Sequence, residues 1–549
     1  MTTTVAHLLC QGMKDVGIDH LYCLPGVQND DFFNALVDYP EIKPIATRNE
    51  QACSYMAAGA AQASGKPQAY CVVPGQAVLN AGAGHSTAFS TASRVLALLG
   101  ENKSHFIGRM HGQLHELADQ TAIVSQMSKH TETLMDPATP RSQIRTALSA
   151  LISGHPAPVS VQCPLDRWIT PSMTLDPVEE ARPEVDLDAV NKAADLLADA
   201  KNPIIVLGGG AHGAPQAIVE IAEMLKAPVS ALRQGKGAYD EARPLAVMGP
   251  VAHEIWKTAD VALGIGTRFM WHEMVWGVDD DLSLVQINAD PGEINRRGNV
   301  AVPICAMVED VLPALIEALA TRLGTVEDRT DHVAGLKGTF DQRVRNLQPT
   351  YDDLMVIRQV LGEDGIFVDD LTQVAYAARY ILPVHRPRGY VCAGYAGTLG
   401  WGMPAGLGAA LASPGKRVIT VQGDGGFLYC AQELATSVKH RIPHVTLVYN
   451  DNAYGNVQRI QEDRFGHNRT IATDLHNPDI VKFAESFGAF AIRSKPGSEN
   501  LRLALEEAFA QDGPAIVEMP TPERYPSPWG HIFLPTVRGP SQAPLLANG

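Results

Sequence analysis

The sequence has 549 residues, with 44 Lys and Arg against 60 Asp and Glu, and its formal net charge of −16 argues against non-specific binding to nucleic acid. Hydrophobic residues make up 45% and charged residues 19%, a composition typical of an ordinary globular protein and not of a disordered chain. No apolar run is long enough to span a bilayer, and the first residues lack the basic segment and apolar core of a signal peptide. The eight cysteines are scattered without a CxxC pair, which predicts reduced thiols and a cytoplasmic location.

Short runs rich in Val and Ile alternate with alanine-rich helical stretches along the chain, the pattern of α/β domains with mainly parallel sheets. The pattern appears three times, with an acidic, proline-containing stretch and then a charged stretch between the repeats. We therefore predict three consecutive α/β domains at 1–170, 188–325 and 350–521, followed by an extended C-terminal arm at 522–549. The predicted strands are 68–73, 94–99, 158–162, 203–207, 228–232, 261–265, 284–288, 365–369, 418–421, 443–449 and 514–518.

The first block contains an alanine-rich helix that begins near Glu50, in the segment Arg-Asn-Glu-Gln-Ala-Cys-Ser-Tyr-Met-Ala-Ala-Gly at 48–59. Taken alone, Glu50 is a glutamate that the dipole of a helix N-terminus favours. Gln28 and His115 are two further polar residues of this block, and the family resemblance of the motifs described below makes them candidates for contact with a substrate. Gln28 is suited to orient a carbonyl or carboxylate group, and His115, as a histidine, is suited to exchange a proton. The other interpretation of His115 is a surface or core histidine, one of 18 in the chain.

The third block contains two glycine-rich segments. Residues 394–405 read Gly-Tyr-Ala-Gly-Thr-Leu-Gly-Trp-Gly-Met-Pro-Ala, which is typical of a turn from a strand into a helix. The second segment follows the strand at 418–421, where glycines flank Asp424 and leave backbone N–H groups free to approach a phosphate closely. The Asp424 carboxylate offers the kind of oxygen that a hard cation prefers.

A second strand end lies close to Asp424 in the predicted sheet. The strand at 443–449 ends at Asn450, Asp451 and Asn452. Ligands of open parallel sheets collect at the carboxyl ends of the strands. Two neighbouring strand ends therefore offer carboxylate and amide oxygens to one Mg²⁺.

Together these motifs resemble the signatures of thiamine diphosphate enzymes of the pyruvate oxidase, pyruvate decarboxylase and acetohydroxyacid synthase group, and the resemblance covers nearly the whole chain. It implies a pyrimidine-binding, a central and a diphosphate-binding domain. It also implies that Glu50 contacts and activates the aminopyrimidine ring of the cofactor, that the Gly397 carbonyl accepts from the amino group of that ring, and that Leu399 wedges between the two cofactor rings. The remaining implied cofactor residues are Gly423, Asp424, Gly425, Gly426, Asp451, Tyr454 and Gly455, and the implied metal ligands are Asp424, Asp451 and the Ala453 carbonyl.

The sequence departs from the pattern of that group at several positions. Asp451 stands where asparagine is common, which adds a negative charge beside the diphosphate and leaves Asn450 and Asn452 as alternative ligands. Val27 stands where decarboxylases of the group carry an acid or a serine, so this position cannot relay a proton. Acetohydroxyacid synthases usually show Gly-Gln where this chain has Gly-Glu at 100–101, which puts a strict acetolactate synthase assignment in doubt.

The resemblance implies a thiamine diphosphate- and Mg²⁺-dependent carbon–carbon lyase or ligase that decarboxylates a 2-oxo acid through an enamine or acyl-anion intermediate. Carboligation to an acceptor carbonyl, as in acetolactate synthase, is a close competitor. The implied assembly is a homodimer or homotetramer with active sites between subunits, acting on small molecules and not on nucleic acid or membranes. The alternatives are a flavin-dependent 2-oxo acid oxidase and cleavage of a hydroxy-ketone, a diketone or a 2-hydroxyacyl-CoA. FAD is not favoured, because the glycine turns at 208–210 and 264–268 lack the full dinucleotide-binding pattern.

Overall fold

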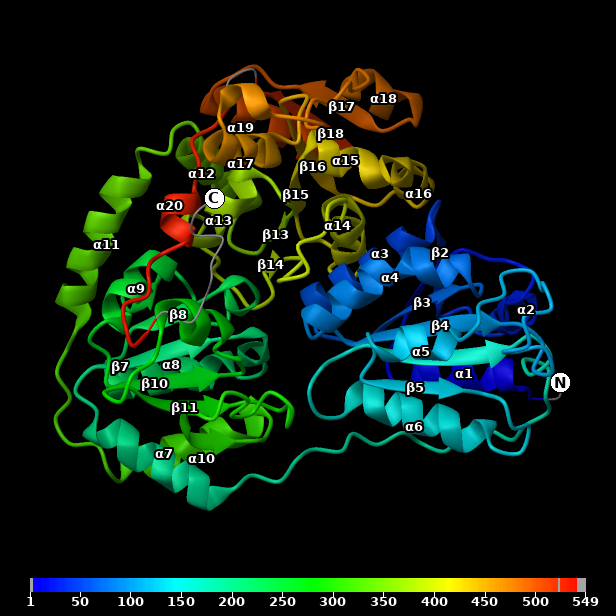
Figure 1. Ribbon diagram of the computed structural model, residues 1–549, viewed down its shortest axis with the longest axis horizontal. Coiled ribbons are helices and arrows are strands. Elements are labelled where there is room, and N and C mark those ends of the chain that lie inside the picture. The colour runs from blue at the N-terminus through cyan, green and yellow to red at the C-terminus, as the bar shows by residue number, and fades with distance from the viewer. Residues whose placement is uncertain (1–2, 522–523, 541–549) are drawn as a thin grey trace.

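The computed structural model describes residues 3–521 and 524–540, and in this part of the chain it contains three six-stranded sheets in succession (Figure 1). The strand pairs of all three sheets are parallel. The predicted fold, three consecutive α/β domains with mainly parallel sheets, is therefore confirmed. The strands of each sheet lie within the three predicted domain ranges, which we retain as proposed boundaries.

The first domain has the strand order β2-β1-β3-β4-β6-β5. Its central strands are buried along their whole length, because helices cover both faces of the sheet. Its elements are α1 (Val5–Asp15), β1 (His20–Cys23), α2 (Asp30–Leu36), β2 (Lys43–Ala46), α3 (Glu50–Ser64), β3 (Gln68–Val72), α4 (Gln76–Ser90), β4 (Val95–Glu101), α5 (Gln120–Ser125), β5 (His130–Thr133), α6 (Pro140–Ile152) and β6 (Val159–Pro164).

The central domain has the strand order β12-β11-β10-β7-β8-β9. Its glycine turns pack against each other, since a Cβ on Gly208 would lie 2.2 Å from the Gly266 carbonyl oxygen. A Cβ on Gly266, which has φ +58°, would in turn lie 2.5 Å from the Gly210 Cα, so close approach accounts for glycine at both 208 and 266. The elements are α7 (Leu187–Asp199), β7 (Pro203–Leu207), η1 (Gly209–Gly213), α8 (Pro215–Leu225), β8 (Val229–Ala231), η2 (Arg233–Gly235), β9 (Ala246–Val247), α9 (Gly249–Trp256), β10 (Val261–Ile265), η3 (His272–Trp276), β11 (Ser283–Ile287), β12 (Val300–Ile304) and α10 (Val308–Ala320).

The third domain has the strand order β14-β13-β15-β16-β18-β17. The charged stretch before it contains a helix, α11 (Thr330–Val344), which runs along the outside of the molecule (Figure 1). The other elements are α12 (Thr350–Leu361), β13 (Ile366–Asp369), α13 (Gln373–Ile381), β14 (Tyr390–Val391), α14 (Gly402–Leu411), β15 (Val418–Gly423), α15 (Asp424–Cys430), η4 (Ala431–Glu433), α16 (Leu434–Lys439), β16 (Val445–Asn450), α17 (Gly455–Phe465), η5 (His467–Arg469), α18 (Ile480–Ser486), β17 (Phe490–Arg493), α19 (Ser498–Phe509) and β18 (Ala515–Pro520).

The predicted extended arm is wrong in one respect, because it contains a short helix, α20 (Trp529–Ile532). After this helix the arm reaches the central domain, where the N–H groups of Val537 and Arg538 donate to the Trp276 carbonyl. The buried Arg538 guanidinium also donates to the Trp256 carbonyl at 2.6 Å. The arm thus fastens the third domain to the central one. The rest of the predicted arm, 522–523 and 541–549, lies outside the described residues.

Buried histidines make the stability of the protein sensitive to acid. Burial lowers the pKa of His85 to about 4 and the pKa values of His212, His272 and His444 to about 3. In the unfolded chain these histidines bind protons as the pH falls through about 6.5, whereas in the folded chain they stay neutral until a much lower pH. The free energy of unfolding is therefore unaffected above about pH 6.5 and decreases as the pH falls below it. At pH 5 the loss is about 2 kcal/mol for each such histidine.

We expect His444→Gln to flatten this dependence, since glutamine takes up no proton and can still accept from the Thr420 hydroxyl that lies 2.8 Å from His444 Nε2. The measurement is the melting temperature between pH 5 and pH 7.5, with the exposed His467→Gln as a matched control. Parallel curves for His444→Gln and the parent protein would contradict the prediction.

Candidate functional site

The ends of β15 and β16 form the centre of the candidate site. These strands are neighbours, and their register pairs Gly423 with Tyr449. Asp424 follows β15 and begins α15, while Asn450 ends β16. The side chains that follow the two strands therefore lie at one edge of the sheet, as the sequence predicts for a metal site.

An amide group marks the point on which oxygens from both strand ends converge. Nδ2 of Asn477, in the loop before α18, donates to Asp424 Oδ2 at 2.5 Å, to Asn450 Oδ1 at 3.1 Å and to Asn452 Oδ1 at 3.2 Å. Carboxylate and amide oxygens are also what Mg²⁺ prefers. The oxygens of Asp424, Asn450 and Asn452 therefore fit a hard cation, which would occupy the space that the Asn477 amide group fills.

The two carboxylates of the site influence each other. Asp424 is buried, and its burial raises its pKa above the usual value. The pKa of Asp451 is raised to about 6, first by burial and then by the negative charge of Asp424. A bound cation would relieve this repulsion and stabilise both ionised groups. Asp451 Oδ1 accepts from the N–H of Ala453 at 3.2 Å, which holds Ala453 beside this carboxylate.

At two positions around these carboxylates, any side chain larger than that of glycine would displace a neighbouring side chain of the site. A Cβ on Gly425 would lie 2.6 Å from the Tyr454 ring, and a Cβ on Gly455 would lie 2.1 Å from Asp451 Oδ2. A Cβ on Gly426 would approach Asp370 Oδ2 at 3.3 Å, a tight contact. Open space surrounds Gly423, where nothing lies closer than 4.0 Å to an added Cβ. This cradle fits a group that must approach the backbone closely, such as a diphosphate.

The loop between β14 and α14 carries the residues predicted to meet the cofactor rings. Gly397 has φ +56° and is exposed, with only the Tyr395 carbonyl oxygen within 4 Å of an added Cβ. Leu399 is half-buried. Between them, Thr398 Oγ1 lies 2.6 Å from the hydroxyl of Tyr55 on α3, which ties this loop to the first domain.

Glu50 is the first residue of α3, as predicted from the sequence, and Asn49 caps the helix by accepting from the Gln51 N–H. The Glu50 carboxylate is half-buried, and its Oε2 accepts from Asn80 Nδ2 on α4 at 3.0 Å. Asn80 therefore fixes one oxygen of Glu50, and the other oxygen remains available to a ligand.

Gln28 and His115 lie close together in the first domain. Gln28 is buried; its Nε2 donates to the Leu114 carbonyl at 3.3 Å, and its Oε1 has no partner in the described structure. His115 has φ +63°, and its Nδ1 lies 3.1 Å from Oε1 of Gln76. Gln76 is four residues before Asn80 on α4, so one face of this helix holds both His115 and Glu50.

The structure thus gathers the predicted residues into two groups, one around Glu50, Gln28 and His115 and one around Asp424 and Asp451. In residues 3–521 and 524–540, no hydrogen bond joins Glu50, Gln28 or His115 to Asp424 or Asp451. The same residues contain no group of three or more His, Cys, Asp and Glu side chains suited to a metal, so amide and carbonyl oxygens must complete any set built on the two aspartates.

Three residues of the site were not predicted from the sequence: Asn477, Asn80 and Gln76. Asn477 is 53 residues from Asp424, and no motif links the two. Asn80 and Gln76 are four apart at the start of an alanine-rich helix, a spacing that identifies one helix face but not its partners.

The chain matches three family models over most of its length. All three describe thiamine pyrophosphate enzymes. The N-terminal TPP binding domain matches residues 3–123, the central domain matches 190–315, and the C-terminal TPP binding domain matches 370–519. Among the residues that the structure describes, no helix is long and apolar enough to cross a membrane.

Similar proteins span nearly the whole chain. A probable 2-ketoarginine decarboxylase, AruI, of Pseudomonas aeruginosa is 29% identical over 94% of this chain and 94% of its own. A probable acetolactate synthase large subunit of Methanocaldococcus jannaschii is 28% identical over 94% of this chain and 91% of its own. The acetolactate synthase large subunit of Haemophilus influenzae is 29% identical over 92% of each chain.

Proposed function

The chain belongs to the thiamine pyrophosphate enzymes, and from this premise we propose that it is a thiamine diphosphate- and Mg²⁺-dependent carbon–carbon lyase or ligase whose first step is decarboxylation of a 2-oxo acid. The observation that carries the proposal is the convergence of oxygens from Asp424, Asn450 and Asn452 at the ends of β15 and β16. The similar decarboxylase and synthases support the reaction class. Unpaired cysteines throughout the chain are in keeping with a cytoplasmic enzyme.

Each group of residues has a distinct task in this proposal. Thiamine diphosphate, when bound, supplies a ring that accepts the electrons of the bond that breaks beside the carbonyl. Asp424 and Asp451, with the Ala453 carbonyl, would hold the metal, and Asn450 and Asn452, whose oxygens converge with that of Asp424, are the alternative ligands. Gly425 would let the diphosphate approach the backbone. Glu50 would hold a proton at the aminopyrimidine ring, and Leu399 would fill the space between the two rings.

Substrate contact falls to the residues beside α4. The free Oε1 of buried Gln28 needs a donor, and a carboxylic acid, hydroxyl or water brought with the substrate would provide one. His115 would hold a proton for the product, since its Nδ1 is fixed by Gln76 and its Nε2 is left to act. Cofactor binding alone would need neither residue, so Gln28 and His115 favour an enzyme over a protein that only binds the cofactor.

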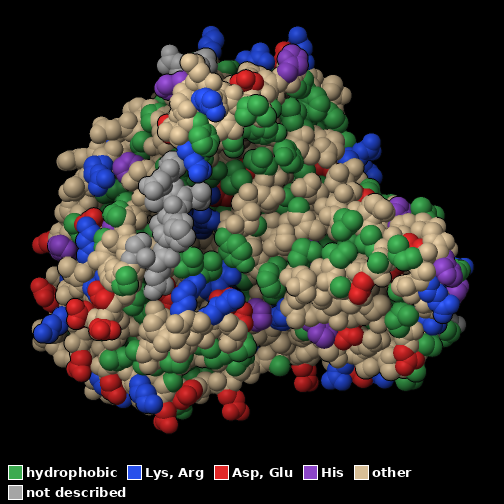
Figure 2. All heavy atoms as spheres, in the orientation of Figure 1, with side chains coloured by type: hydrophobic (Ala, Val, Ile, Leu, Met, Phe, Trp, Pro, Cys, Tyr) green, Lys and Arg blue, Asp and Glu red, His purple; other side chains and the backbone are tan. Residues whose placement is uncertain are grey.

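We propose that the complete site forms between two subunits of a homodimer or homotetramer. The elements that carry site residues also expose apolar side chains, including Val27 (59% exposed) and Leu114 (61%) in the first domain and Tyr395 and Tyr429 in the third. Figure 2 shows charged side chains crowding the lower and left edges of one face, whereas mainly hydrophobic and uncharged surface lies where the first domain meets the third. A second copy would cover such surface and unite the two groups of residues.

Mixing two inactive variants tests this arrangement. Glu50→Gln and Asp424→Asn should each be inactive alone, but a hybrid dimer would contain one site with both intact residues. Random mixing of subunits should therefore restore roughly a quarter of wild-type activity. The measurement is turnover after the two variants are unfolded and refolded together. A mixture that stays inactive, although tagged hybrids are recovered, would place each complete site within one subunit.

The reaction itself is tested by CO₂ release from a panel of 2-oxo acids that includes pyruvate and 2-ketoarginine. The protein is first stripped and then reconstituted with thiamine diphosphate and Mg²⁺, and products are identified by mass. An aldehyde product identifies a decarboxylase, and a 2-hydroxy ketone or acetohydroxy acid identifies a ligase. Cofactor binding without CO₂ release from any 2-oxo acid would refute decarboxylation as the first step.

A further inference from the structure

A buried glutamate of the third domain accepts hydrogen bonds from the backbone just before Glu50. Glu433, at the end of η4, is fully buried, and its Oε1 and Oε2 accept from the backbone N–H of Arg48 at 2.9 and 3.2 Å. Thr436 Oγ1 donates to Glu433 Oε2 at 2.6 Å. The carboxylate therefore has partners in two domains, and it takes no part in the oxygen cluster around Asn477.

The segment bound by Glu433, residues 47–49, connects the end of β2 to the start of α3. Arg48 is two residues after Ala46, the last residue of β2, and two residues before Glu50. The Thr436 hydroxyl also lies 3.3 Å from the Ala46 carbonyl oxygen. Glu433 and Thr436 of the third domain thus contact the turn before Glu50 at two points, its start at Ala46 and its middle at Arg48.

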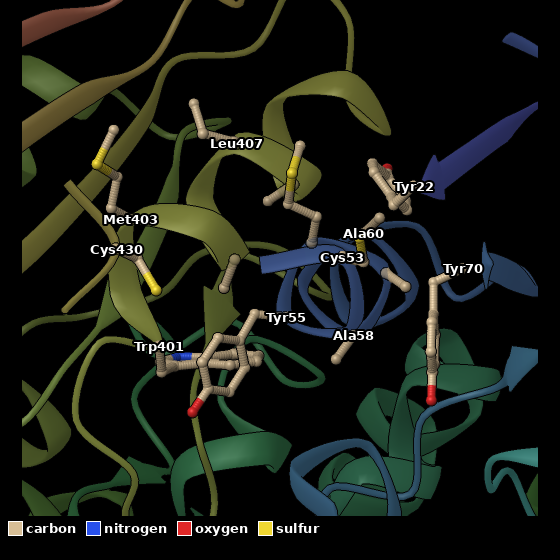
Figure 3. Close-up of a cluster of buried hydrophobic side chains, with 14 of the residues drawn as sticks. Tyr22, Cys53, Tyr55, Ala58, Ala60, Tyr70, Trp401, Met403, Leu407 and Cys430 are labelled. Atoms are coloured by element: carbon tan, nitrogen blue, oxygen red, sulfur yellow. The ribbon is translucent and has the colours of Figure 1, made fainter. Parts of the chain in front are cut away.

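The remainder of α3 is fixed by close packing against α14 (Figure 3). A Cβ on Gly59 would lie 2.3 Å from the Ala405 carbonyl oxygen, so the two helix backbones touch. Tyr55 packs edge-on against Trp401, with ring centroids 5.7 Å apart, and Gln62 exchanges two hydrogen bonds with the backbone of Cys392. These contacts fix α3 from Tyr55 onward. The first turn of the helix lies before them, so its position depends on the contact between Glu433 and Arg48.

We propose that Glu433 is a positioning residue that orders the first turn of α3 and thereby aims the Glu50 carboxylate at its ligand. The consequence for catalysis rests on the proposed function, whereas the ordering of the turn does not. A hydrocarbon side chain at position 433 would leave the Arg48 N–H without its acceptor in a partly buried place, and would leave the Thr436 hydroxyl only its longer contact with the Ala46 carbonyl oxygen. The turn would then open to reach water, and Glu50 would lose its fixed direction.

The conservative substitute is glutamine. Burial raises the pKa of Glu433 to about 7, so the neutral side chain is already accessible near physiological pH. Glutamine keeps one accepting oxygen for the Arg48 N–H and has the same shape. We therefore expect Glu433→Gln to retain most of the ordering and Glu433→Leu to lose it. Gln62→Leu is a matched control, because it cuts the tie between the other end of α3 and the third domain.

The test compares amide hydrogen exchange in the full-length protein without substrate. In Glu433→Leu, exchange of the peptide spanning 46–52 should accelerate about tenfold or more. Exchange in the same peptide should change less than about threefold in Glu433→Gln and in Gln62→Leu. Under the proposed function, kcat of Glu433→Leu should also fall at least tenfold with KM nearly unchanged, and Glu433→Gln should restore most of it.

The outcomes separate this inference from the proposed function. Faster exchange confined to 46–52, in a protein that turns over no 2-oxo acid, would uphold the positioning role and refute the proposed reaction. Unchanged exchange at 46–52, or equal acceleration in all three domains, would overturn the positioning role. If Glu433→Leu does not fold, Thr436→Val replaces it. This variant removes the hydroxyl that donates to Glu433 and contacts the Ala46 carbonyl oxygen, and it should accelerate exchange at 46–52 by a smaller factor, about threefold or more.

Discussion

Glu50→Gln is expected to lower kcat by about 10² to 10⁴ while the Kd for thiamine diphosphate changes less than about tenfold. Glutamine preserves the length of the side chain and can still accept from Asn80, so the helix start and the cofactor pocket keep their shape. It cannot hold a proton, which is the task that Glu50 has in the proposed function. The measurement is kcat with the identified 2-oxo acid, together with cofactor affinity from fluorescence quenching.

The matched control makes the same chemical change away from the site. Glu41 is exposed in the same domain and pairs with Lys14 at 2.5 Å on the surface, so Glu41→Gln should leave kcat unchanged. Retention of more than about a third of wild-type kcat by Glu50→Gln would show that Glu50 is not the proton-holding group. A loss of cofactor binding equal to the loss of kcat would instead make Glu50 a binding residue.

The central strands of the three sheets were predictable because they are buried on both faces. Strands such as β7 (Pro203–Leu207) and β10 (Val261–Ile265) carry uninterrupted apolar runs, and the ends of the predicted strands shift by at most two residues. The outer strands of the sheets were missed, and so was the inner strand β1 (His20–Cys23) of the first domain. β5 (His130–Thr133) is half-exposed along its length and β14 has two residues, so neither has an apolar run to detect.

The candidate site was predictable where one segment supplies several of its parts. The Gly-Asp-Gly segment at 423–425 and the first turn of α3 each combine a backbone shape with a candidate side chain. The first is the junction where β15 ends and α15 begins, and the second begins at Glu50. The supporting residues come from distant parts of the chain: Asn477 is 53 residues from Asp424, and Glu433 is 385 residues from Arg48. Only the folded chain brings them together, because sequence spacing carries no information about such contacts.

Asp424→Asn is expected to weaken Mg²⁺ binding by at least about a hundredfold and so to abolish turnover. Asp424 is the buried carboxylate of the oxygen cluster, and the Asn477 amide at 2.5 Å shows that its Oδ2 points into the space proposed for the cation. An asparagine there would remove the negative charge on which affinity for a hard cation depends. The measurement is a titration with Mn²⁺ by electron paramagnetic resonance in the presence of thiamine diphosphate.

Asp451→Asn provides the matched comparison, since it makes the same substitution at the second carboxylate. Partial burial and the negative charge of Asp424 raise the pKa of Asp451 to about 6, and asparagine keeps an oxygen at this position while it removes the repulsion. We therefore expect Asp451→Asn to bind Mn²⁺ within about tenfold of the parent protein and to melt at a higher temperature without metal. Equal losses of affinity in the two variants would mean that both charges are needed for the cation. A normal affinity in Asp424→Asn would place the metal away from the ends of β15 and β16.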